Sequence, residues 1–248
     1  MKKIILIITF AILTSFAHGQ TSATDSNRQG IEQLNSGQFA DAARSFEQAV
    51  QAKPDYASAH YNLGTAYYHL RRFDDSMASL SRAAEIDPSS AAFRNQIGVV
   101  LLEKGQLAAA TAAFEHATRL DPANPTARYN LGCAYIRKGK FRDAVDSLER
   151  AKALEPRNVE VRINLAYALS ELRRMEKVVE EMRAASGLAP ADPFVRLALG
   201  NLLVLNNDRA NAISEYATLK RLDSGHAQKL YDAIYQGRVI SVASFAAR

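Results

Sequence analysis

Residues 57–90 read ASAHYNLGTAYYHLRRFDDSMASLSRAAEIDPSS, and this stretch decides the fold. Apolar residues recur three or four positions apart, first around Leu63 and Tyr67 and then around Leu80. Such spacing places the apolar residues on one face of a helix. Pro88 ends the second series, because proline lacks an amide donor and disfavours helical backbone in the preceding residue. The stretch therefore predicts two helices joined by a short break.

The pattern recurs along the chain with a period of 34 residues. Proline closes the copies, glycine lies within the first helix, and a large apolar residue of the second helix packs beside that glycine. These rows are Pro54, Pro88, Pro122, Pro156 and Pro190; Gly30, Gly64, Gly98, Gly132 and Gly200; and Phe46, Leu80, Phe114, Leu148, Met182 and Tyr216. In the break, Gly37, Gly105 and Gly139 are expected to supply the positive φ that ends a helix.

Six repeats are predicted, at about residues 23–56, 57–90, 91–124, 125–158, 159–192 and 193–226, within a helical region of residues 20–236. A capping helix is expected at 227–236, and the tail 237–248 has no assignment. Each helix pair leaves an apolar face that only its neighbours can cover, so the repeats must stack.

The chain resembles tetratricopeptide-repeat (TPR) proteins over about residues 23–226. The resemblance is carried by Leu63-Gly64-x-x-Tyr67 and Leu131-Gly132-x-x-Tyr135, by Ala42-x-x-x-Phe46 and Ala110-x-x-x-Phe114, and by the proline row. It implies an all-α fold, a right-handed α-solenoid superhelix of helix–turn–helix repeats with a C-terminal capping helix.

The first residues are typical of a secretory signal peptide. Lys2 and Lys3 precede an apolar run too short to span a bilayer comfortably, and small residues come before Gln20. We expect residues 1–19 to be removed and the protein to be periplasmic or secreted; the alternative is an uncleaved inner-membrane anchor. Removal takes away two lysines and lowers the net charge from +5 to about +3.

Composition and motifs argue against an enzyme. The chain has one cysteine, and its histidines do not have the spacing of a zinc-binding helix. No glycine-rich nucleotide loop and no nucleophile elbow occurs. We expect no catalytic residues, no metal and no cofactor.

The TPR resemblance implies a concave groove lined by fixed positions of each first helix. Tyrosine rings there offer large contact area for a peptide or helix, and asparagines beside them offer hydrogen bonds. The alternative is that these residues only serve packing. The predicted groove residues are Tyr61, Asn62, Thr65, Tyr68, Asn95, Val99, Tyr129, Asn130, Cys133, Ile136, Arg137, Asn164 and Tyr167.

Cys133 has two interpretations. The simpler one is a small, moderately apolar residue. The other is a redox-sensitive thiol or an intermolecular disulfide, since export leads to an oxidising compartment.

A row of arginines, Arg94, Arg128, Arg162 and Arg196, keeps the same period. The row is expected to lie in the seam between repeats, over apolar surface and paired with Asp87, Asp121 or Glu155. The alternative is a polyanion-binding stripe.

These observations predict a non-catalytic scaffold that binds a protein or peptide in its groove and helps to assemble or regulate an envelope complex. A pilus-biogenesis or outer-membrane assembly factor is a narrower alternative, although the lipid-anchor cysteine is missing. Nucleic acid and stable membrane insertion after signal cleavage are not expected.

Overall fold

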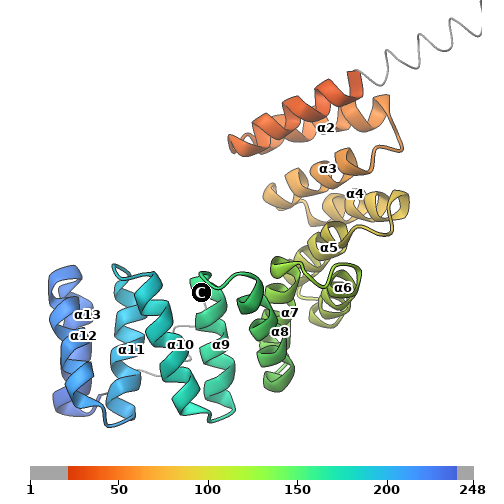
Figure 1. Cartoon of the computed structure of the whole chain (residues 1–248). Helices are drawn as coiled ribbons and strands as arrows, with labels where there is room; N and C mark the ends of the chain where they lie inside the picture. Colours follow the sequence, from red (N-terminus) through yellow and green to blue (C-terminus); the bar gives the residue numbers. More distant parts are fainter. Residues whose placement is uncertain (1–21, 239–248) are drawn as a thin grey trace, which may run out of the picture. The chain divides into compact units, whose positions relative to one another are not determined.

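Helices form the regular secondary structure throughout residues 22–238, the part of the chain that the computed structural model describes (Figure 1). After a helix over 22–35, they are α2 (Phe39–Ala52), α3 (Ala57–His69), α4 (Phe73–Ile86), α5 (Ala91–Glu103), α6 (Leu107–Leu120), α7 (Pro125–Arg137), α8 (Phe141–Leu154), α9 (Val159–Glu171), α10 (Met175–Leu188), α11 (Pro193–Leu205), α12 (Arg209–Leu222) and α13 (Ser224–Gln236). The fold is an all-α solenoid, as the sequence predicts. The predicted signal peptide and the tail beyond Arg238 lie outside the described residues.

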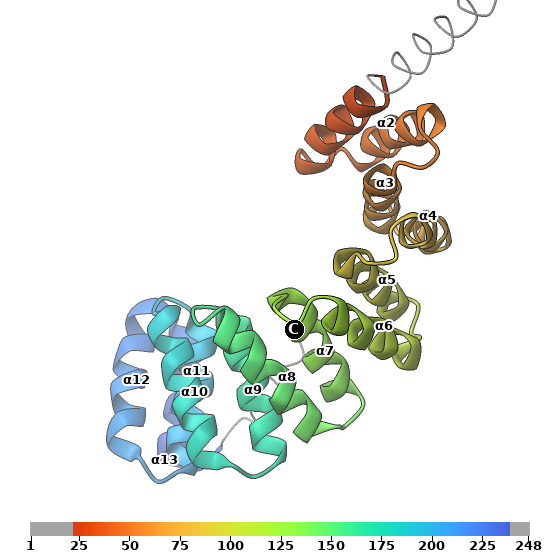
Figure 2. The same ribbon diagram turned by 45° about the vertical axis from the view of Figure 1, so that its right-hand side comes forward.

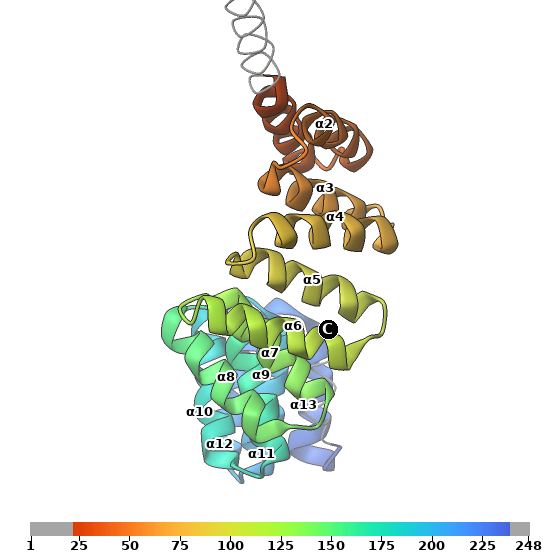
Figure 3. The same cartoon turned by 90° about the vertical axis from the view of Figure 1, so that its right-hand side faces the viewer.

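The chain divides into two compact units, Met1–Pro122 and Ala123–Arg248. In unit 1, α3 packs on α4 and α4 on α5, one after another (Figure 3). In unit 2, the pairs α7/α8, α9/α10 and α11/α12 follow in the same manner, and α13 packs against both α11 and α12 (Figure 2). We call the helix over 22–35, α3, α5, α7, α9 and α11 first helices, and their partners α2, α4, α6, α8, α10 and α12 second helices.

One residue in every turn between a first and a second helix has left-handed backbone. The angle φ is 74° at Gly37, 72° at Gly105 and 69° at Gly139, and it is 58° at Arg71, 57° at Arg173 and 58° at Asn207. The glycine prediction is confirmed. Arginine adopts the same conformation although it strains an L-residue by about 1–2 kcal/mol, so the packing of the flanking helices enforces the turn.

Glycine in the first helix permits close contact with the second helix. A Cβ added to Gly64 would lie 2.6 Å from Cγ of Leu80, and one on Gly132 would lie 2.6 Å from Cγ of Leu148. Leu80 and Leu148 are fully buried, which gives these repeats a close-packed centre.

Gly200 departs from this pattern. The atom nearest to an added Cβ is Cδ2 of Leu230, at 2.4 Å, and Leu230 belongs to α13. Tyr216, which the period places beside Gly200, is only half-buried. The capping helix therefore takes over part of the packing that a second helix provides elsewhere.

The ends of the helices follow from local chemistry. Side-chain oxygens of Ser90, Asn124, Asn158 and Asp192 accept hydrogen bonds from backbone N–H groups in the first turns of α5, α7, α9 and α11. Each second helix from α2 to α10 ends on a residue with non-helical backbone, and the proline of the 34-residue row follows it.

Candidate peptide-binding surface

In unit 1, the predicted groove residues lie on α3 and α5 and are half-buried. The ring of Tyr61 stacks on Phe93 with centroids 5.1 Å apart. Tyr68 lies 6.2 Å from the ring of Phe73. These aromatic rings are therefore held in place by packing, with part of each exposed. On α5, Asn95 and Val99 occupy the places that Tyr61 and Thr65 occupy on α3.

The polar groups on this surface are bonded within the chain. Nδ2 of Asn62 donates to Oδ1 of Asn27 at 3.0 Å, and the hydroxyl of Thr65 donates to the carbonyl of Tyr61 at 3.0 Å. Asn62 thus links two consecutive first helices.

In unit 2, the predicted residues lie on α7 and α9. Nδ2 of Asn164 donates to the hydroxyl of Tyr129 at 3.2 Å and to the carbonyl of Glu160 at 3.0 Å. Tyr129 and Ile136 are half-buried against the core of the unit. The ring of Tyr167 meets Phe141 edge-on, 6.3 Å between centroids.

The remaining predicted residues of unit 2 are all on α7. Asn130 and Cys133 are half-buried, and Arg137, in the last turn, is exposed. Asn130 has interactions within the chain, as Asn95 has in unit 1.

Burial sets the titration of the Tyr129–Cys133 pair. It raises the pKa of the Cys133 thiol to about 11, although the hydrogen bond to Tyr129 and the nearby Arg137 act in the opposite direction. Burial and the neighbouring thiol likewise raise the pKa of Tyr129. The thiol is therefore protonated at neutral pH, and a protonated thiol is a poor nucleophile.

The corresponding residues of α11 are buried. Leu197 and Asn201 occupy the places that Ile163 and Tyr167 occupy on α9, and they are only 2% and 0% exposed. Leu230 of α13 lies against the same helix, at Gly200. The open surface of unit 2 is therefore on α7 and α9.

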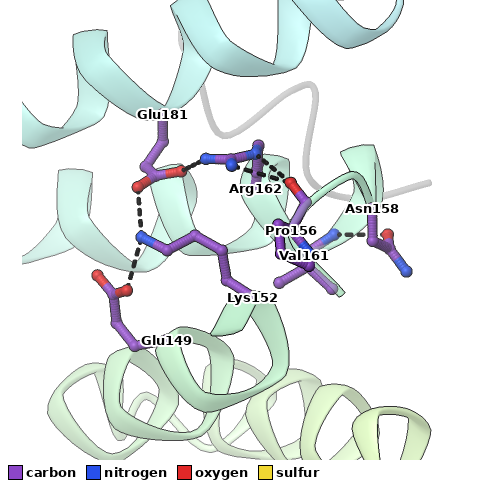
Figure 4. A network of polar contacts seen from close by, with 7 residues as sticks. All are labelled: Glu149, Lys152, Pro156, Asn158, Val161, Arg162 and Glu181. Carbon is purple, nitrogen blue, oxygen red and sulfur yellow. Dashed lines mark hydrogen bonds and ion pairs between the residues drawn. The ribbon is translucent and has the colours of Figure 1, made fainter. Parts of the chain in front are cut away.

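Two arginines of the periodic row, Arg162 and Arg196, pair with acids other than the expected ones, and Figure 4 shows the surroundings of Arg162. Nη1 of Arg162 lies 2.7 Å from Glu181, and Nη2 donates to the carbonyl of Pro156 at 2.9 Å. Lys152 is 2.6 Å from the same carboxylate, which is almost completely buried. The expected pairing of Arg162 with Glu155 is wrong, because the guanidinium turns toward α10.

Arg196 repeats this arrangement one period later, with Glu215 at 2.7 Å and the carbonyl of Pro190 at 2.6 Å. Glu181 and Glu215 are themselves 34 residues apart, so the two pairs follow the period of the sequence. In unit 1, Ala113 takes the corresponding place, and Nε of Arg94 is buried without a hydrogen-bond partner. The arginines of the row therefore differ in their partners from one repeat to another.

Metal-ion sites and membrane-spanning helices are both absent from residues 22–238. No group of three or more His, Cys, Asp or Glu side chains there has a geometry that could hold a metal ion. None of the helices in this range combines the length and the apolar character needed to cross a membrane.

Residues 30–195 match the family described as Cilia and flagella-associated protein 70 C-terminal domain, a TPR domain. The chain belongs to this family. The match covers the second to fifth predicted repeats in full and most of the first. Among curated proteins, no relative matches significantly.

Solved structures of TPR proteins are similar in fold. The structure titled as the functional characterisation of pilF from Pseudomonas aeruginosa has a TM-score of 0.74 at 21% identity, covering 86% of this chain and 98% of that one. YrrB, described as a TPR protein with an unusual peptide-binding site, has a TM-score of 0.63 at 20% identity, covering 75% and 97%. MamA has a TM-score of 0.59 at 21% identity, covering 67% and 91%. At these identities the likeness concerns the fold.

Proposed function

We propose that the protein is a non-catalytic scaffold that binds a segment of a partner protein on its first helices. The observation that carries this proposal is the set of partly exposed rings and aliphatic side chains on consecutive first helices of each unit. Rings fixed by packing, such as Tyr61 and Tyr167, lose little conformational entropy on binding and offer large contact area. The peptide-binding site named for YrrB is consistent with such a role for the shared fold.

Photo-crosslinking in cells tests this proposal. A crosslinking amino acid replaces Tyr129 or Tyr167, and mass spectrometry identifies the captured protein. Leu154, an exposed apolar residue on the second helix α8, is the matched control position. We expect the same protein to be captured from 129 and 167 and not from 154. Capture of no protein from the two groove positions, or the same set from all three, would refute the proposal.

For the cellular role, we propose assembly or regulation of an envelope complex, with pilus biogenesis or outer-membrane assembly as the narrower version. The support is the signal-peptide pattern of residues 1–19 and the fold shared with pilF of Pseudomonas aeruginosa. Cell fractionation of the tagged full chain, with and without substitution of Lys2 and Lys3 by Glu, tests export. A protein that stays in the cytoplasm in both forms contradicts this role.

Polyanion binding by the arginine row has less support. Arg162 and Arg196 each have a carboxylate at 2.7 Å and a backbone carbonyl within reach, so their charges are already neutralised within unit 2. The experiment for this alternative is retention on heparin, expected to match that of a neutral control protein.

A further inference from the structure

Basic residues gather on two consecutive turns of unit 2. Residues 137–143 surround the turn between α7 and α8, and residues 171–177 surround the turn between α9 and α10. Together these two segments, which we call the basic edge, hold seven basic and three acidic side chains. The seven basic residues are all exposed: Arg137, Lys138, Lys140, Arg142, Arg173, Arg174 and Lys177.

The corresponding turns of other repeats do not have this excess of positive charge. In unit 1, residues 69–75 and 103–109 hold three basic and three acidic side chains, and in unit 2 residues 205–211 hold one of each. In unit 1, Arg72 pairs with Asp75 at 2.8 Å. Within the part of the chain that the structure describes, none of the seven cations of the basic edge is in an ion pair. The basic edge therefore presents its positive charge to the solvent.

Helix stability does not account for four of these cations. Lys140 and Arg174 are the N-cap residues of α8 and α10, and neither side chain makes a capping hydrogen bond. Arg142 and Lys177 lie in the first turns of the same two helices. A positive charge at a helix N-terminus opposes the helix dipole and lowers the stability of the helix. A ligand outside the chain gives these cations a role that the helices do not.

The two turns of the basic edge lie side by side. Short connections make α7 antiparallel to α8 and α8 antiparallel to α9, so α7 and α9 run in the same direction. The hydrogen bond from Asn164 to Tyr129, at 3.2 Å, joins residues 35 positions apart and keeps the ends of α7 and α9 level. Four helix ends thus form the edge, and the axes of packed helices are about 8–10 Å apart. The cations therefore cover an area and not a single line.

We propose that the basic edge binds the anionic phospholipid headgroups of a membrane surface. A planar layer of phosphate groups can meet all four helix ends at once, whereas a linear polyanion such as heparin follows one row of cations. Guanidinium and ammonium groups both bind phosphate oxygens. None of the exposed large apolar residues found in residues 22–238 lies in the two turns, so binding is by charge and without insertion. The inference goes beyond the proposed function and does not depend on it.

Cosedimentation with lipid vesicles tests the inference. The full chain is mixed with vesicles of phosphatidylcholine that contain about 30% phosphatidylglycerol, and the bound fraction is measured at about 0.1 M and about 1 M salt. Vesicles of phosphatidylcholine alone measure the binding that does not depend on headgroup charge. We expect the anionic vesicles to bind more of the protein than the neutral ones at the lower salt concentration. At the higher concentration the two should bind equally, because the Debye length falls from about 10 Å to about 3 Å.

Two triple variants each neutralise three cations of one turn. They are Lys138→Gln/Lys140→Gln/Arg142→Gln and Arg173→Gln/Arg174→Gln/Lys177→Gln. Each cation near an anionic membrane contributes about fivefold to binding, so each triple variant should bind the anionic vesicles about 100-fold more weakly. Circular dichroism checks that each variant is folded, and the two turns provide independent tests.

The matched control removes the same charge from exposed residues of α12 and α13. It is the variant Lys220→Gln/Arg221→Gln/Lys229→Gln. Because these residues lie outside the basic edge, this variant should bind the anionic vesicles as the natural chain does.

Equal binding to anionic and neutral vesicles at the lower salt concentration would overturn the inference. Binding that neither triple variant weakens, or that the control variant weakens as much, would overturn it too. Heparin or polyglutamate that displaces the vesicles at an equal concentration of negative charge would show a site for a linear polyanion instead of a membrane. Crosslinking from positions 129 and 167 is measured separately, so failure of the proposed function is distinguishable from failure of this inference.

Discussion

The left-handed residue at Arg173 allows the most direct test of the reasoning about the repeat. Its φ of 57° strains a residue with a Cβ, whereas Gly139 has the same backbone at the corresponding turn of the preceding repeat. Relief of this strain gains about 1–2 kcal/mol. The greater freedom of glycine in the unfolded chain offsets about 0.4–1 kcal/mol. Arg173→Gly should therefore stabilise the protein by about 0.5–1 kcal/mol.

The assay is urea unfolding of the full chain, followed by circular dichroism. With a typical dependence of about 2 kcal/mol per molar urea, the midpoint should rise by about 0.3–0.5 M. The reverse substitution, Gly139→Ala, should lower it by about 0.3–0.5 M, because it introduces the strain and removes the unfolded-state freedom of glycine, which offsets part of it. Lys177→Gly is the matched control, since it also removes one positive charge but lies in α10.

Glycine within a helix costs about 1 kcal/mol, so Lys177→Gly should lower the midpoint. Arg173→Gly and Lys177→Gly must therefore shift it in opposite directions. If both lower it, the turn at Arg173 is not strained.

Three further predictions concern unit 2. Glu181→Gln removes the carboxylate between two cations and should destabilise the protein by about 2–4 kcal/mol, measured by urea unfolding, with an unchanged midpoint counting against the network. Asn164→Ala and Tyr129→Phe should each lower the free energy of unfolding by about 1 kcal/mol, and the double variant should lose little more than either single variant. Additive losses would contradict the hydrogen bond between the two side chains. For Cys133, the raised pKa of about 11 against an ordinary 9.0 predicts reaction with a disulfide reagent at pH 8 roughly 100-fold slower in the native chain than in urea. Reaction of the native thiol as fast as that of the unfolded chain would contradict its burial. Because the pKa of Cys133 is raised in the folded chain, the stability that this thiol contributes is complete below pH 9.0 and is lost between pH 9.0 and about pH 11.

The candidate surface was only partly accessible to sequence reasoning. Repeat position placed Tyr129 and Tyr167 on the first helices, and the structure has them there. It did not reveal that Asn164 uses its amide within the chain, because that depends on the spacing of α7 and α9. Nor did it reveal that α13 packs on α11 at Gly200, since a helical pattern at 227–236 does not specify which neighbour the helix packs against.

The sequence by itself determined the helices, their turns and the 34-residue period. Apolar spacing, proline at the end of second helices and glycine at close contacts are local rules that hold wherever the segment lies. Only the tertiary structure decided the partners of the polar groups, as with Arg162, which meets Glu181 instead of Glu155. A long side chain can reach several acids, and the acid with which it pairs depends on which helix the fold brings near.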